Sequence, residues 1–224
     1  MLKLYHNPLS VNSRRVWIAL LEKKLEFQLV EIRLDGDQLQ PEFLKMNPFH
    51  HIPVLEDDGF SVLESLAILD YLEAKFPIPA LLPTDAKTIA TMRMVEMVTV
   101  NELLPAMNPL ISRMMGFPGG NDPQKLEQAK EKSAIVLRFF EKLLADHSYF
   151  GGEQLTLADI VAGTAVPWFP ILGFPLIDYP KLSAWAERLM QRPAWQTTQP
   201  TPEAIEAFKS RMEALVKQYE ANQN

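Results

Sequence analysis

The sequence predicts an α/β N-terminal domain followed by an all-α C-terminal domain. Strand-like and helix-like segments alternate through residues 1–76, whereas the long periodic segments after that region are all helical. Between them lies Pro77–Thr84, which is too rich in proline for a helix or a central strand. We therefore expect the two domains to span residues 1–80 and 85–224.

The N-terminal region has the element order βαβαββα. Its first strand alternates in hydrophobicity, and the helix after it carries apolar residues at helical spacing. Asp58-Gly59 is a strong hairpin signal between the last two strands. The expected segments, in order, are Leu2–Tyr5, Arg15–Lys24, Phe27–Ile32, Glu42–Met46, Ile52–Leu55, Phe60–Leu63 and Ser65–Lys75.

Apolar residues at helical spacing mark the segments of the C-terminal region. We expect helices over Thr88–Met115, Pro123–Ala145, Leu157–Phe169 and Lys181–Gln191. A last helix begins at Thr201-Pro202, where threonine can cap and proline occupies the first helical position. The apolar face of that helix consists of Ile205, Phe208, Met212, Leu215 and Tyr219.

Thr156 and Asp159 have the spacing of a capping box. A cap of this kind contributes about 1 kcal/mol to stability. Because such caps are common, we expect these residues to be structural rather than catalytic.

Composition and charge exclude several classes of function. The 224 residues are 47% hydrophobic and 22% charged, with a net charge of −6, as in ordinary globular proteins. The acidic balance and the lack of a long basic run argue against binding to nucleic acids or anionic membranes. We find neither a signal peptide nor a membrane span, so we expect a cytoplasmic location. No Cys/His cluster indicates a metal or a redox cofactor.

A serine stands where a redox protein would carry cysteine. Ser10 and Ser13 have C-x-x-C spacing at the expected strand-to-helix junction, yet the chain contains no cysteine. Either serine could cap the helix. If this site handles a thiol, the thiol must therefore belong to a ligand.

Several segments together resemble the cytosolic glutathione S-transferases, most nearly the serine-type classes (phi, delta and theta) and their bacterial relatives. The resemblance covers most of residues 1–195, with the segments in the family's order. It implies a thioredoxin-like N-terminal domain, a helical C-terminal domain, a homodimer, and glutathione as co-substrate. The segments are Ser10–Val16, Asn47–Leu55, Leu63–Ser65, Leu81–Pro83 and Thr156–Asp159.

The resemblance selects Ser10 as the catalytic residue, because the family's serine lies four residues before the first arginine of this run. A hydroxyl at a helix N-terminus can donate to the glutathione thiolate, with help from the helix dipole. A hydrogen bond to a charged group contributes about 1.5–3 kcal/mol, so Ser10 could lower the thiol pKa by roughly one to two units. The residues alone do not exclude Ser13 as the donor.

The resemblance also implies how the γ-glutamyl and cysteinyl units of glutathione are bound. Ile52 precedes Pro53, in a bond that is cis in the family, and would present its backbone to the cysteinyl unit. Ser65 would hold the γ-glutamyl carboxylate, and Glu64 would balance the neighbouring amino group.

At the glycyl end, Gln38 and His51, with His50 beside it, match residues that contact glutathione in related classes. One position departs from the pattern. Leu66 stands where phi and delta members usually carry arginine, so we expect a polar contact to the γ-glutamyl unit to be missing.

The electrophile pocket would lie between the domains, with Leu9, the first C-terminal helix and the last helix as its walls. Methionine suits a pocket for varied apolar ligands. We expect Pro105 and Pro109 to kink the first helix, and Trp168 and Phe169 to lie in the core. The methionines of that helix, which Asn101 and Asn108 accompany, are Met92, Met94, Met97, Met107, Met114 and Met115.

These observations favour a detoxifying glutathione S-transferase that conjugates glutathione to an apolar electrophile. Leu66 supports a second hypothesis, a non-catalytic binding or assembly module on the same fold. A third is another glutathione-dependent enzyme, such as a peroxidase or an isomerase.

Overall fold

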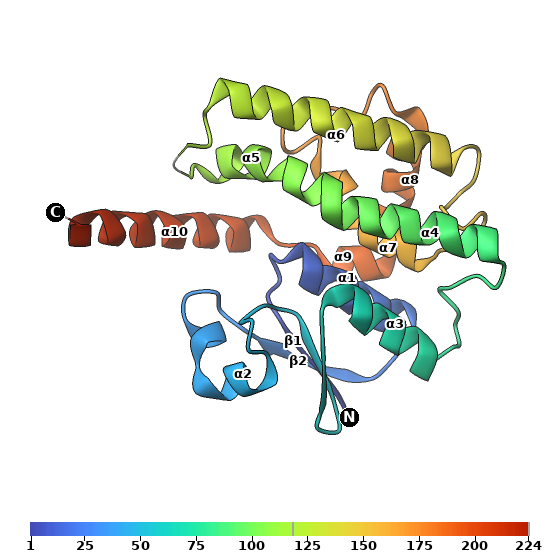
Figure 1. The fold of residues 1–224 in the computed structure, drawn as a ribbon, viewed down its shortest axis with the longest axis horizontal. Coiled ribbons are helices and arrows are strands. Elements are labelled where there is room, and N and C mark those ends of the chain that lie inside the picture. Colours follow the sequence, from blue (N-terminus) through green and yellow to red (C-terminus); the bar gives the residue numbers. More distant parts are fainter. Residues whose placement is uncertain (118, 224) are drawn as a thin grey trace.

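A computed structural model describes residues 1–117 and 119–223 and comprises an α/β part and a helical part (Figure 1). The α/β part has the predicted βαβαββα order, with a four-stranded sheet in the order β2-β1-β3-β4. β1 pairs parallel with β2 and antiparallel with β3, which pairs antiparallel with β4. The elements are β1 (Leu2–His6), α1 (Val11–Glu22), β2 (Phe27–Glu31), a 3₁₀ turn η1 (Asp37–Leu39), α2 (Pro41–Met46), β3 (Val54–Asp57), β4 (Phe60–Leu63) and α3 (Ser65–Lys75).

Helices cover both faces of this sheet. Leu4 of β1 and Leu55 of β3 are paired in register, and both are buried in the main core with residues of α1 and α3. Phe43 of α2 is buried on the other side, in a separate apolar cluster with Val54. β3 begins two residues later than predicted, because Pro53 has no N–H to give to a strand ladder.

The helical part differs from the prediction in where its helices end. The helix predicted over Thr88–Met115 is divided by a π-helical turn, and the one predicted over Leu157–Phe169 ends at Gly163 before a short 3₁₀ turn. The elements are α4 (Ala86–Val98), the π turn η2 (Thr99–Leu103), α5 (Leu104–Met115), α6 (Pro123–Leu144), α7 (Leu157–Gly163), the 3₁₀ turn η3 (Val166–Trp168), α8 (Pro180–Met190), α9 (Pro193–Thr198) and α10 (Pro202–Gln223).

Proline chemistry accounts for the π turn. Pro105 lies at the start of α5, directly after η2. A proline lacks the N–H for the helical bond to the fourth residue before it, here Asn101, and its ring clashes with that carbonyl. The wider π turn accommodates both defects without ending the helical path.

The capping box at the start of α7 is confirmed. The fully buried Asp159 carboxylate accepts hydrogen bonds from the Thr156 N–H (2.8 Å), the Phe150 N–H (2.9 Å) and the Trp185 indole N–H (2.9 Å). This one side chain therefore joins α7 to the preceding loop and to α8.

α1 lies where the two parts meet. The Arg14 Nε donates to the Thr198 carbonyl of α9 over 2.9 Å. At the other end of α1, Glu22 pairs with Arg192, with an Nη2–Oε2 distance of 2.6 Å. The helical part is thus attached at both ends of α1.

α10 extends away from α9, and its far end projects beyond the other elements (Figure 1). Leu215 and Tyr219, predicted on its apolar face, lie among the side chains that the structure does not describe. Within residues 1–117 and 119–223, no helix is long and apolar enough to cross a membrane.

We predict that Asp159→Ala lowers the free energy of unfolding by about 3 kcal/mol or more, because several buried donors lose their acceptor. Urea unfolding at neutral pH measures this loss. Asp146→Ala is the matched control, since the Asp146 side chain is 96% exposed and pairs only at the surface with Lys181 (2.9 Å). Equal losses in the two variants would contradict the structural role of Asp159.

Candidate functional site

Two cavities meet at the N-terminal end of α1. The first has a volume of about 330 Å³ and walls of mixed character; we call it the polar cavity because most of its lining residues are polar. The second, which we call the apolar cavity, has about 500 Å³ and is largely apolar. Asn12 and Leu34 line both, so the cavities are neighbours. The residues that line the polar cavity are Asn12, Leu34, Asn47, His50, His51, Ile52, Pro53, Glu64 and Ser65.

Ser10 caps α1 and lines the apolar cavity. Its Oγ accepts a hydrogen bond from the Ser13 N–H over 3.3 Å. Because that bond uses a lone pair of the oxygen, the hydroxyl proton remains available to a group in the cavity. Ser13, by contrast, is fully buried, lines neither cavity, and accepts from the Asn7 N–H over 3.3 Å. The geometry therefore favours Ser10 over Ser13 as a donor to a ligand.

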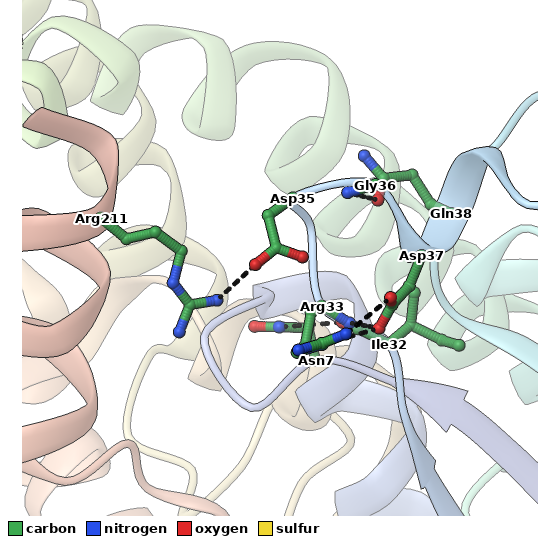
Figure 2. A network of polar contacts seen from close by, with 8 residues as sticks. All are labelled: Asn7, Ile32, Arg33, Asp35, Gly36, Asp37, Gln38 and Arg211. Carbon is green, nitrogen blue, oxygen red and sulfur yellow. Dashed lines mark hydrogen bonds and ion pairs between the residues drawn. The ribbon is translucent and has the colours of Figure 1, made fainter. Parts of the chain in front are cut away.

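Asn7 holds the loop that carries Ser10. Its side-chain NH₂ donates to the Ile32 carbonyl (3.0 Å), as Figure 2 shows. Its backbone carbonyl accepts from the Ser10 N–H (3.0 Å). These bonds tie the loop to the segment that follows β2. Ser10 is thereby positioned by the sheet as well as by its own helix.

Ser65, the first residue of α3, is held in the same way. Its Oγ accepts from the Arg15 Nη1 over 3.3 Å, which leaves the hydroxyl proton for the polar cavity. Arg15 is fully buried, and its Nε and Nη2 have no hydrogen-bond partner among the described residues. Burial lowers the pKa of Arg15 to about 10, against the opposing effect of Glu96, so the guanidinium is charged at neutral pH. Ser65 thus stands between a buried cation and the cavity.

Glu64 enters the polar cavity from a strained backbone. Its φ of 64° lies in the region that glycine favours, and its side chain is exposed. Across the cavity, the Ile52-Pro53 bond is cis, as the resemblance implied, so the backbone of Ile52 precedes β3 at the cavity wall. A second cis bond joins Ile78 to Pro79.

The predicted glycyl-end residues do not all come together. His50 and His51 line the polar cavity. Gln38 lines neither cavity, and its side-chain oxygen accepts from the Gly36 N–H over 3.2 Å (Figure 2). A contact between Gln38 and a ligand therefore stays a prediction.

The residues that line the apolar cavity differ in part from those expected. Met92 is buried in the core, and Met94 and Met97 are each 44% exposed away from the cavity. Trp168, predicted to lie in the core, lines the cavity, whereas Phe169 is buried as expected. The residues that line it are Leu9, Ser10, Val11, Asn12, Leu34, Leu104, Met107, Asn108, Ile111, Met114, Met115, Phe117, Trp168, Ile205 and Phe208.

Sequence reasoning missed some of these residues. Asn12 could have been found from its place between the two serines. Ile205 and Phe208, by contrast, lie on the apolar face of the last helix, which was expected to be a wall of this pocket. Leu34 gives no such signal, because it follows β2 in an irregular loop. Within residues 1–117 and 119–223, no cluster of His, Asp or Glu side chains could hold a metal ion.

Both parts of the chain match family models of known proteins. Residues 4–81 match the glutathione S-transferase N-terminal domain, and residues 103–193 match the glutathione S-transferase C-terminal domain. These matches contain the whole polar cavity and most of the apolar one.

Individual relatives agree with these matches. Glutathione S-transferase F10 of Arabidopsis thaliana is 33% identical, over 88% of this chain and 95% of its own length. Maleylacetoacetate isomerase of Rattus norvegicus is 31% identical, over 84% and 87%. The crystal structure of glutathione transferase F7 from Populus trichocarpa is 30% identical and superimposes with a TM-score of 0.77, over 88% and 97%.

His6, at the end of β1 before the Ser10 loop, predicts a pH dependence. Burial lowers its pKa to about 4, below the value of about 6.5 in an unfolded chain. Between these values the unfolded chain binds a proton that the folded protein does not, so stability falls as the pH drops through this window. The maximum loss from this group is about 3 kcal/mol.

His6→Phe keeps an aromatic ring next to Trp17, whose ring centroid lies 5.1 Å from that of His6, but removes the titration. We expect this variant to lose less stability than the wild type between pH 6.5 and pH 4.5, as measured by urea unfolding. An equal loss in both proteins would show that His6 does not set this dependence.

Proposed function

Because this chain belongs to the glutathione S-transferase family, we propose that it is a serine-type enzyme that joins the glutathione thiolate to an apolar electrophile. One observation carries the proposal. The Ser10 hydroxyl borders the apolar cavity with its oxygen engaged by the Ser13 N–H, so its proton is free to donate to sulfur. The polar cavity next to it is lined by Glu64, Ser65 and two histidines, which are groups that can bind the charged ends of a tripeptide.

The chemistry follows from stabilising an anion at this point. Ser10 donates to the sulfur, and the first N–H groups of α1, which have no acceptor within the helix, add the positive end of the helix dipole. Both favour the thiolate, so the thiol proton is released to solvent at neutral pH. The sulfur then forms a bond to the electrophilic carbon, and the electron pair passes to a leaving group or to a heteroatom that takes up a proton.

We assign the ligand contacts according to the polar cavity. The Ile52 backbone would bind the cysteinyl unit, Ser65 the γ-glutamyl carboxylate, and Glu64 the amino group. His51, with His50 and Gln38, remains the proposal for the glycyl end.

The position of Arg15 explains how glutathione can bind although Leu66 replaces the arginine of related proteins. Leu66 packs partly buried against the core instead of supplying the family's arginine. The buried Arg15 guanidinium places a positive charge directly behind the Ser65 hydroxyl, 3.3 Å from its oxygen. A hydroxyl that accepts from a cation donates more strongly to an anion, because hydrogen bonds in a chain polarise one another.

The lining of the apolar cavity supports an uncharged electrophile. None of the described residues that line it is Lys, Arg or His. Maleylacetoacetate, the substrate in the name of the rat relative, is a dicarboxylate, and such a cavity offers it no charge partner. Conjugation of an apolar compound is therefore favoured over that isomerisation.

We further propose that the protein is a cytoplasmic homodimer that detoxifies such electrophiles, with the domain boundary within residues 81–84. Exposed apolar side chains on the α/β part and on α4 support a dimer. They include Phe60 (60% exposed), Met94 (44%) and Met97 (44%).

Ser10→Ala should raise the pKa of bound glutathione by roughly one to two units and slow conjugation about 10- to 100-fold at neutral pH, because a hydrogen bond to the thiolate is lost. Thiolate absorbance of the glutathione complex gives the pKa, and an aryl halide gives the rate. Ser10→Thr keeps a hydroxyl and should retain most of the activity. An unshifted pKa with full activity in Ser10→Ala would refute the assignment.

Arg15→Gln should weaken glutathione binding about tenfold, because Ser65 loses the charge behind it. An analogue without the γ-glutamyl α-carboxylate should be affected much less, and calorimetry measures both affinities. Arg15→Lys is a second variant that keeps the charge and should bind glutathione more tightly than Arg15→Gln. Equal weakening for the two ligands would mean that Arg15 is only structural.

A further inference from the structure

α10 contributes to the apolar cavity although it lies outside the region that the family models cover. Ile205 and Phe208, in its first turns, line the cavity together with Leu9 and Leu34. The rest of the helix projects beyond the body of the protein (Figure 1). The position of this wall therefore depends on whatever fixes the start of α10.

An ion pair fixes α10 at the edge of the cavity. The Arg211 Nη1 lies 3.3 Å from the Asp35 Oδ2, as Figure 2 shows. Arg211 is three residues after Phe208, so the two side chains lie on the same side of the helix. Asp35 directly follows Leu34, which lines both cavities. The pair thus connects α10 to the loop that carries Leu34, and both segments contribute residues to the apolar cavity.

The loop that carries Asp35 has polar contacts of its own besides the one to α10. The Arg33 guanidinium binds the Asp37 carboxylate through Nε (3.1 Å) and Nη2 (3.2 Å), and the Arg33 N–H donates to the same carboxylate (3.0 Å). Because the Arg33 guanidinium binds Asp37, the Asp35 carboxylate pairs with Arg211 instead (Figure 2). The contacts of Arg33 with Asp37 lie within the loop and do not involve α10.

The pair is weak enough to open. Its side chains are 44% (Arg211) and 29% (Asp35) exposed, and pairs of this kind contribute about 0.2–1 kcal/mol. Salt screens them, since the Debye length is about 10 Å at 0.1 M ionic strength. A contact of this strength changes an affinity by up to about fivefold.

We propose that α10 is a closing wall of the electrophile cavity and that the Arg211–Asp35 pair makes it select long apolar electrophiles over short ones. The inference rests on the proposed function, because it takes this cavity as the electrophile site. A long substrate reaches Ile205 and Phe208 and gains their contacts only when the wall is closed. A short one near Ser10 does not reach them.

Two isothiocyanates test the selection with the same chemistry, in which the thiolate sulfur adds to the central carbon and the nitrogen takes up a proton. Asp35→Asn and Arg211→Gln should each raise the KM for phenethyl isothiocyanate about three- to fivefold and leave the KM for allyl isothiocyanate unchanged. Lys209→Gln is the matched control, because Lys209 pairs with Glu206 within α10 (2.8 Å) and not across the cavity.

A charge-exchange variant distinguishes loss of the ion pair from a general loss of structure. The double variant Asp35→Arg with Arg211→Asp should recover the wild-type KM for the phenethyl compound. Raising the salt concentration from 50 to 500 mM should raise that KM in the wild type but not in Asp35→Asn. Failure of the exchange to recover the KM, or an equal effect in Lys209→Gln, would overturn the proposal.

A binding measurement separates this inference from the proposed function. The neutral fluorescent probe N-phenyl-1-naphthylamine needs no catalysis, and its Kd should rise three- to fivefold in Asp35→Asn. If the wild type shows this dependence but conjugates neither isothiocyanate, the proposed function fails and α10 remains a closing wall. If the probe binds both proteins equally, α10 does not close the cavity.

Discussion

The first turns of α1 fix both hydroxyls on which the site depends. The Ser13 N–H occupies the oxygen of Ser10, and the Arg15 guanidinium occupies that of Ser65, so each hydroxyl keeps its proton for a ligand. Both donors belong to one rigid helix and lie two residues apart. The separation between the proposed sulfur-binding and anion-binding points is therefore set by helix geometry and not by two independent loops.

The same helix carries the attachment of the helical part. Arg14 donates to Thr198 of α9, and Glu22 accepts from Arg192, the residue before α9. Arg15 lies buried near Glu96 of α4. Burial of these charges costs desolvation energy that ion pairs in a protein interior only partly return. An apolar helix would pack here at lower cost. The charged residues of α1 are thus better explained by the need to align the walls of two cavities than by stability.

Local patterns predicted the order of elements and the serine-capped helix, because caps, hairpin turns and apolar periodicity act over a few residues. These patterns failed to predict which residues share a helix face where the regular helix is interrupted. The π turn before Pro105 adds a residue to the helical path, which rotates the following face by about 100°, so methionines before and after it cannot share one wall. Arg15 was missed for another reason: its partner, Ser65, is fifty residues away in sequence.

Glu64, which lines the polar cavity, has a strained backbone. Its backbone at φ 64° costs about 1–3 kcal/mol relative to a residue that adopts this region freely. Glycine would relieve that strain but would remove the carboxylate from the cavity. Selection for thermal stability and selection for ligand recognition therefore oppose each other at this residue. A variant obtained by screening for folding stability alone would be expected to lose Glu64, and with it the carboxylate proposed to bind the ligand.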